Sequence, residues 1–255
     1  MTRKAPKSAT ILVNTAWTKP AVAIGKGQTH LVITLQTPKV KRSTARMPLD
    51  VAFVIDRSGS MSGQPLELAK RGVAEAIQML DGNDRFAVIG YDNEIQHLYP
   101  FSTADAASKR RVTAQLQEVR SGGSTNLFGG WQAGVWSVSP ARWPHYTYGQ
   151  QSDGRLRRVI LLSDGLANVG DTDPSSITSQ VGQWRAAGVS SSTLGLGEHV
   201  DDLLLMGMAE AGGGNYAFAG SPSDLPGFFA HELGEPLQVF ATGASLTLTL
   251  PKGVR

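Results

Sequence analysis

The segment from which the architecture follows reads Val51-Ala52-Phe53-Val54-Ile55-Asp56-Arg57-Ser58-Gly59-Ser60. Its first five residues are all apolar, which is the pattern of a central parallel strand buried on both faces. A D-x-S-x-S motif follows at residues 56–60. Because alternate side chains of an extended segment point the same way, Asp56, Ser58 and Ser60 present a carboxylate and two hydroxyls together. Such a group of hard oxygen ligands indicates a cation site.

The composition excludes several classes of protein. The 255 residues are 41% hydrophobic and 18% charged, which is typical of a globular protein with a buried core. The net charge is +3 and there is no cysteine, so disulfides, zinc–thiolate sites and thiol nucleophiles are excluded. The basic clusters lack interleaved aromatic residues, which argues against nucleic acid as a partner. The sequence leaves the oligomeric state open.

The apolar run that follows the basic N-terminus, Ile11-Leu12-Val13, is too short for a signal-peptide core, and no stretch approaches the length of a membrane span. The chain as it stands is therefore expected to be cytoplasmic, or at the cell surface if an upstream segment has been removed.

Hydrophobic patterning divides the chain into three parts. Residues 1–47 are expected to form a tail and β-strands, and in residues 48–237 strands and helices alternate, as in an α/β domain with a mainly parallel sheet. Residues 238–255 contain a strictly alternating segment at 244–250. We expect this segment to return to the N-terminal strands in a small antiparallel β-sandwich that is incomplete within this chain. The predicted fold is a Rossmann-like, doubly wound sheet flanked by helices and by this sandwich portion.

Within the α/β region the apolar spacing predicts each element. Strands are expected at 51–55, 86–91, 95–99, 159–162, 189–196 and 216–218, and helices at 65–80, 103–119, 127–138, 174–187, 200–211 and 222–236.

The two fully apolar strands each end in an acidic residue. Asp56 follows the first strand, and Asp164 follows the second within Leu161-Leu162-Ser163-Asp164-Gly165. Doubly wound sheets bind ligands at the carboxyl ends of strands, where the winding direction reverses. If the two strands are neighbours there, their carboxylates converge on one crevice. The glycine-rich segment 121–126 would bring Thr125 to the same place.

These motifs, in this order and spacing, resemble the von Willebrand factor A domain, and bacterial members are the most similar. The resemblance covers about residues 50–236. In that family the five corresponding residues form the metal-ion-dependent adhesion site. The resemblance implies direct ligation by Ser58 and Ser60, and by Thr125 when a ligand is engaged. Asp56 and Asp164 would act largely through coordinated water.

The ligand-binding rim of this site is expected to include Asn126, Glu198 and His199. An all-oxygen shell of hydroxyls, carboxylates and waters favours Mg²⁺; Mn²⁺ is an acceptable substitute, whereas Ca²⁺ usually needs more carboxylate oxygens. Because the carboxylates stand one water away, the ion keeps residual positive charge. The implied partner is another protein that presents an Asp or Glu carboxylate, and the predicted function is metal-dependent protein interaction or adhesion, without catalysis.

Two alternative functions stay open. Some proteins with this domain act inside the cell as adaptors of AAA-type ATPases in chelatase-like machines. A metal-dependent hydrolase is the other class, but a haloacid-dehalogenase-like enzyme needs a second carboxylate where Ser58 stands. No nucleophile elbow, P-loop or H-E-x-x-H motif occurs.

A purely structural interpretation also exists for some of these polar residues. Ser58 and Ser60 would then only cap the following helix, and Asp173, ahead of Pro174, is predicted to be an N-cap. The aromatic segment 140–153 is expected to pack on its own domain at the end remote from the metal.

Overall fold

The computed structural model describes residues 12–17, 30–36, 47–139, 154–234 and Thr247. The chain forms two compact units, one made of residues 1–46 and 239–255 and the other of residues 47–238. In the first unit, β1 (Leu12–Trp17) pairs with β2 (Leu31–Gln36) in a small antiparallel sheet. Apart from Thr247, the predicted strand at 244–250 and the aromatic segment 140–153 lie outside the described residues. The completed sandwich therefore stays a prediction.

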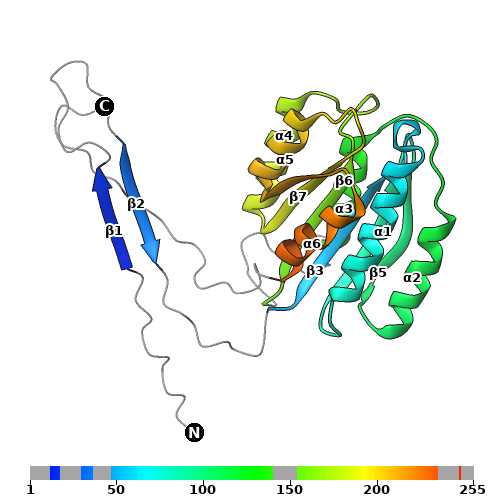
Figure 1. The fold of residues 1–255 in the computed structure, drawn as a ribbon, viewed down its shortest axis with the longest axis horizontal. Coiled ribbons are helices and arrows are strands. Elements are labelled where there is room, and N and C mark those ends of the chain that lie inside the picture. Colours follow the sequence, from blue (N-terminus) through cyan, green and yellow to red (C-terminus); the bar gives the residue numbers. More distant parts are fainter. Residues whose placement is uncertain (1–11, 18–29, 37–46, 140–153, 235–246, 248–255) are drawn as a thin grey trace, which may run out of the picture. The chain divides into compact units, whose positions relative to one another are not determined.

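The second unit is built on a six-stranded sheet in the order β5-β4-β3-β6-β7-β8 (Figure 1). β5 runs antiparallel to β4, and the other pairs are parallel. The strands are β3 (Leu49–Asp56), β4 (Arg85–Tyr91), β5 (Ile95–Thr103), β6 (Leu156–Ser163), β7 (Val189–Leu196) and β8 (Gly213–Ala219). The predicted Rossmann-like, mainly parallel sheet is confirmed.

Helices cover both faces of this sheet (Figure 1). One face carries α1 (Gln64–Met79), α2 (Ala106–Glu118) and α6 (Leu225–Leu233). The other carries α3 (Leu127–Val138), α4 (Pro174–Ala186) and α5 (Asp202–Gly212). None of the helices in the described part of the chain has the length and apolar character needed to cross a bilayer.

Some predicted element boundaries were wrong. β5 continues past Pro100 to Thr103, because an edge strand tolerates a residue without an N–H donor. The next helix therefore starts only at Ala106, after Asp105 caps it by accepting from two backbone N–H groups. The helix predicted at 222–236 is a short 3₁₀ turn, Pro222–Asp224, followed by α6.

β3 is buried on both faces, as its uniform apolar sequence predicts. Val51, Phe53 and Ile55 pack among the side chains of α1 and α6. Ala52 and Val54 face the opposite way and pack against α3. All of β3 is buried, so packing on both faces of the sheet fixes the position of its carboxyl end.

α3 approaches the sheet closely because two glycines, one helical turn apart, face it. A methyl group added at Gly134 would lie 2.4 Å from Cγ2 of Val54, and one added at Gly130 would lie 2.4 Å from the ring of Tyr91. This approach fixes the start of α3, which directly follows the segment that carries Thr125.

We predict that Gly134→Ala lowers the free energy of unfolding by about 1–3 kcal/mol, because the added methyl overpacks the contact with β3. Gly227→Ala, on the exposed side of α6, is the matched control, since its methyl group would meet nothing within 4 Å. It should raise stability by up to about 1 kcal/mol through helix propensity. Urea unfolding of both variants measures the difference, and equal shifts would show that α3 does not need the close approach.

Candidate metal centre

The carboxyl ends of β3 and β6 are neighbours, as the sequence predicted. Ile55 pairs with Leu162 in parallel register. The remaining strands extend outward from this pair, with β4 and β5 beyond β3 and with β7 and β8 beyond β6. The β3–β6 pair is therefore the point where the winding direction reverses, which is the expected ligand position in such a sheet.

Asp56 stands at this point and is fully buried. Its Oδ1 accepts from the backbone N–H of Ser58 at 2.8 Å. Its Oδ2 accepts from the hydroxyls of Tyr91 at 3.1 Å and Ser163 at 2.6 Å. Both hydroxyls come from adjacent strands in the same row of the sheet, so strand register places them. All these donors are neutral.

Burial raises the pKa of Asp56 above its ordinary value. The hydrogen bonds from Ser163 and Ser58 oppose this rise, and the negative charge of Asp164 adds to it. Burial also raises the pKa of Tyr91 well above its usual range, so the phenol stays protonated and remains a donor. The ionised form of Asp56 is thus less favourable here than in water, and a nearby cation would offset this.

The two serines of the motif do not cap a helix. Ser58 is buried and Ser60 is exposed, and their Oγ atoms lie 3.1 Å apart. A 3₁₀ turn, Gly59–Met61, follows Ser58 without a side-chain capping bond. α1 begins later, after Gly63. The capping interpretation therefore does not account for the paired hydroxyls.

The glycine-rich loop at residues 121–126 is tied to the D-x-S-x-S turn by two backbone hydrogen bonds. Gly59 N–H donates to the carbonyl of Gly123 at 3.1 Å, and Gly122 N–H donates to the carbonyl of Arg57 at 2.8 Å. These bonds hold the loop beside the carboxyl end of β3.

Thr125, at the far end of that loop, is tied to the segment that follows Asp164. It is buried, and its N–H donates to the side chain of Asn168 at 2.7 Å. Its carbonyl accepts from the backbone N–H groups of Asn168 at 3.0 Å and Val169 at 3.1 Å. Backbone contacts thus join three loops that carry Ser58, Thr125 and Asp164.

Asp164 is the second buried carboxylate, 3% exposed. Its Oδ1 accepts from the backbone N–H of Leu166 at 3.1 Å. Among the described residues, neither Asp164 nor Asp56 forms an ion pair with a basic side chain. Arg57, which follows Asp56 directly, is paired with Asp92 at 3.1 Å. Two buried carboxylates with neutral partners fit a bound cation.

Hydroxyl groups are essential to any such cation site. The described residues contain no group of three or more His, Cys, Asp or Glu side chains that could hold a metal by themselves. A cation here would depend on the oxygens of Ser58, Ser60 and Thr125 as well as on the two carboxylates. This all-oxygen donor set suits a hard divalent ion.

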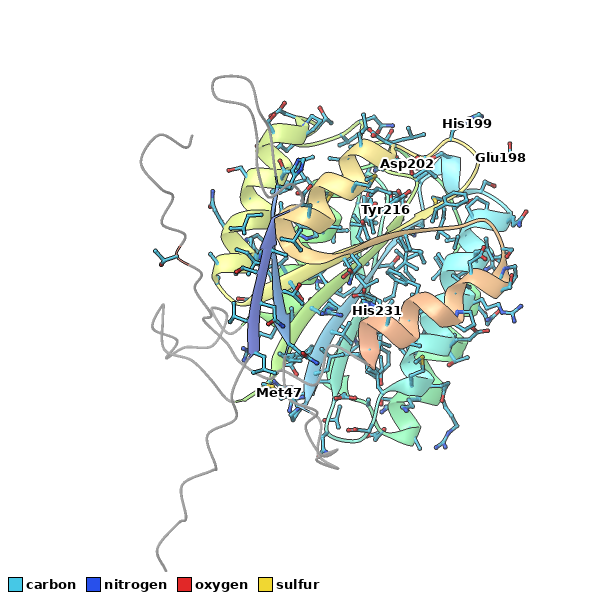
Figure 2. All side chains as sticks on the ribbon, turned by 60° about the vertical axis from the view of Figure 1, so that its left-hand side comes forward. Met47, Glu198, His199, Asp202, Tyr216 and His231 are labelled. Carbon is cyan, nitrogen blue, oxygen red and sulfur yellow. The ribbon has the colours of Figure 1, made fainter. Side chains whose placement is uncertain are left out.

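A pocket of about 640 Å³ opens beside these residues and includes Ser60 and Asp164 in its wall. Glu198 and His199, both exposed, also line it. Figure 2 shows them at the end of the domain opposite Met47. Asn126, the third predicted rim residue, is not in the described lining of this pocket and caps α3 by accepting from the N–H of Gly129 at 3.0 Å.

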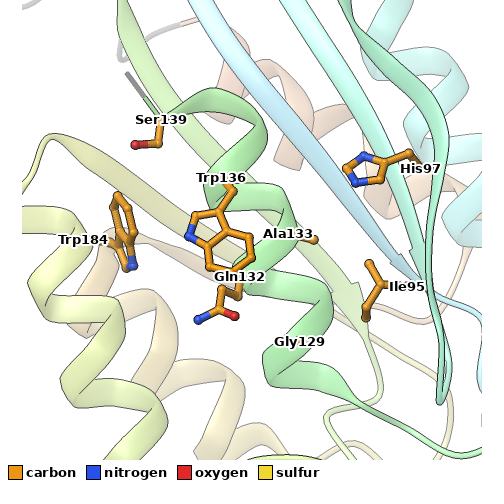
Figure 3. A pocket seen from close by; sticks show the side chains of 8 residues that line it. All are labelled: Ile95, His97, Gly129, Gln132, Ala133, Trp136, Ser139 and Trp184. Carbon is orange, nitrogen blue, oxygen red and sulfur yellow. The ribbon is translucent and has the colours of Figure 1, made fainter. Parts of the chain in front are cut away.

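A second pocket, of about 610 Å³, lies over α3 between β5 and α4 (Figure 3). Figure 3 shows Trp136 between Trp184 and His97. The described lining of this pocket contains none of the predicted site residues, so it is separate from the candidate metal centre.

Sequence reasoning missed Tyr91, Ser163 and Asn168. Ser163 directly precedes Asp164, but only the parallel register shows that its hydroxyl reaches Asp56. The same register places Tyr91, which pairs with Asp56 across β3 and β4.

The chain thus has a doubly wound α/β sheet with two buried acids and two paired hydroxyls gathered at its switch point. Residues 50–231 match the model of the von Willebrand factor type A domain, and the chain belongs to this family. Domains of this family generally serve in protein interaction and adhesion and are non-enzymatic.

Two curated relatives show the extent of the similarity. The chain is 30% identical over 190 residues to the uncharacterized protein YfbK of Escherichia coli (strain K12), covering 72% of this chain and 30% of YfbK. It is 29% identical over 172 residues to inter-alpha-trypsin inhibitor heavy chain H4 of Homo sapiens, covering 66% of this chain and 18% of that protein. The chain thus spans less than a third of the length of either relative.

Among solved structures, the vWF domain of the type V pili tip protein Mfa5 from Porphyromonas gingivalis has a similar fold. The TM-score is 0.56 at 16% identity, covering 80% of this chain and 99% of that one.

We predict that Ser163→Ala lowers the free energy of unfolding by about 1–3 kcal/mol, because buried Asp56 loses a donor and the N–H of Gly165 loses its acceptor. Ser137→Ala is the matched control, since its hydroxyl bonds to the Ala133 carbonyl of its own helix. The control should stay within about 0.5 kcal/mol of the parent. Chemical denaturation without added metal measures both, and an unchanged Ser163→Ala protein would refute this role.

Proposed function

We propose that this domain is a metal-dependent protein-binding module. In this proposal Mg²⁺ is held by Asp56, Ser58, Ser60, Thr125 and Asp164, and an Asp or Glu side chain of a partner protein completes its coordination. The observation that carries the proposal is the pair of buried carboxylates, Asp56 and Asp164, whose described partners are all neutral.

Each residue has a distinct part in holding the ion. The hydroxyls of Ser58 and Ser60 are close enough together, at 3.1 Å, to serve one cation. Thr125 comes from a separate loop, so its contribution depends on the position of that loop. Asp56 is already engaged by three donors, which suits a role through water rather than direct ligation. Bound Mg²⁺ supplies a positive charge that attracts a carboxylate.

The surroundings favour binding over catalysis. The site opens to a pocket whose rim is exposed, so a macromolecule has access to it. The similar fold of a pilus tip domain also agrees with a role in contact between proteins. We therefore propose that the domain has no enzymatic activity of its own.

The central test removes single ligands. Ser58→Ala and Asp164→Ala should each weaken Mg²⁺ binding by about 100-fold or more, since even outer-shell partners of a metal contribute 10–100-fold. Calorimetric titration with MgCl₂ measures the affinity, and circular dichroism checks that each variant is folded. Ser175→Ala is the matched control, because Ser175 is an exposed serine of α4 that is absent from the described lining of the pocket; this variant should bind Mg²⁺ like the parent.

The same proteins test binding to a carboxylate. An immobilised peptide with a central Asp should retain the parent and Ser175→Ala proteins in Mg²⁺ but not in EDTA, and it should retain neither ligand variant. Equal retention in Mg²⁺ and EDTA would disprove metal-dependent binding.

The choice of ion gives an independent prediction. Mn²⁺ should compete with Mg²⁺ at comparable concentration, whereas Ca²⁺ should bind at least about ten-fold more weakly, because only two carboxylates are available to a larger ion. Electron paramagnetic resonance of bound Mn²⁺, titrated with either competitor, gives the order. Preferential displacement by Ca²⁺ would contradict the assigned ligand set.

A further inference from the structure

The pocket beside the candidate metal centre has a wall that combines polar and apolar residues. Ser60 and Asp164 form the side next to the centre, and the remaining wall includes Pro65, Leu166 and Phe218. Pro65 belongs to the first turn of α1, Leu166 to the loop after β6, and Phe218 to β8. Three separate elements therefore bring apolar side chains to one place.

Two of these apolar side chains are strongly exposed. Leu166 is 42% exposed and Phe218 is 51% exposed. Large apolar side chains gathered around a pocket, with polar residues at its rim, mark binding surfaces. Since Ser60 and Asp164 belong to both the pocket and the proposed site, a molecule that reaches the metal lies directly beside this apolar wall.

The charge at the rim restricts what enters. Glu198 lines the pocket and is exposed, so it repels a second carboxylate that approaches on this side. The pocket thus accepts one acidic group at the metal and disfavours another next to it. An apolar side chain packs against the apolar residues of the wall, and it carries no charge for Glu198 to repel.

We propose that this pocket binds a bulky apolar side chain of the partner, such as Phe, Leu or Met, within one or two residues of the acidic residue that meets the metal. The inference rests on the proposed function and names its partner class: a protein segment with one acid, an adjacent large apolar residue, and no second acid beside it. Adjacent residues of an extended chain are about 3.3 Å apart along its length, so one short segment reaches both the site and the pocket.

A panel of immobilised peptides tests the inference. Each peptide has a central Asp, and the two positions on either side carry Ala, Phe, Leu or Glu in turn. In MgCl₂ the parent protein should bind the best Phe or Leu peptide about ten-fold more tightly than the all-Ala peptide, as expected for partial burial of such a side chain. Glu at the same position should weaken binding below that of Ala.

The discriminating variant is Phe218→Ser, because Phe218 lies on β8 and is exposed, so its replacement leaves the loops of the metal centre intact. This variant should bind Mg²⁺ normally and lose most of the preference for Phe or Leu. Leu203→Ser is the matched control, since Leu203 is 84% exposed on α5 and is absent from the described lining of the pocket. It should keep the full preference.

The outcomes separate the two proposals. Two results would overturn the proposed role of the pocket and leave the metal-dependent function standing. One is Mg²⁺-dependent binding with no preference for apolar neighbours. The other is a peptide preference of Phe218→Ser equal to that of Leu203→Ser. A preference for apolar residues that persists in EDTA would support the pocket and overturn the metal-dependent function. Failure of every peptide to bind in Mg²⁺ would overturn both.

Discussion

The carboxylate of Asp56 organises the end of the sheet where the candidate metal centre lies. It is buried between two neighbouring strands, so it must find donors there, and strand register supplies the hydroxyls of Tyr91 and Ser163. The same carboxylate accepts from the N–H of Ser58, which sets the turn that carries the paired serines. The Ser163 hydroxyl also accepts from Gly165 N–H at 2.8 Å and so shapes the turn after Asp164. One buried acid therefore shapes two loops.

The third loop is held in a different way. Backbone bonds join the loop at residues 121–126 to the D-x-S-x-S turn, and Asn168 holds Thr125 from the other side. The glycines of α3 bring the helix behind this loop close to the sheet. None of the described bonds of this loop involves Asp56; backbone bonds to the D-x-S-x-S turn and the bonds to Asn168 position it instead. The hydroxyls of Ser58 and Ser60 thus come from one turn, and Thr125 comes from a second loop that backbone bonds hold beside that turn.

Sequence reasoning was strongest where one physical rule dominates. The uniformly apolar segment 51–55 predicted a doubly buried strand, and the segments 127–138 and 189–196 matched α3 and β7. Sequence reasoning failed where contacts between distant elements determine the local structure. The strand predicted at 95–99 continues to Thr103 as β5, because an edge strand accommodates Pro100. Tyr91 and Ser163 were missed because the register between parallel strands leaves no local signal in a sequence. The apolar pocket was missed because its wall comes from three distant elements.

A cation that binds a carboxylate is by itself a poor discriminator, because acidic residues are common on protein surfaces. Specificity requires a difference in free energy between the correct partner and its competitors. Apolar contacts beside the metal provide such a difference, because they favour a partner with an apolar side chain next to its acidic residue. A negative charge at the rim disfavours a partner with a second acid there. In this domain Phe218 and Leu166 stand on one side of the site and Glu198 on its rim. In the proposed function, the ion would fix where a partner binds, and the pocket beside it would determine which partner that is.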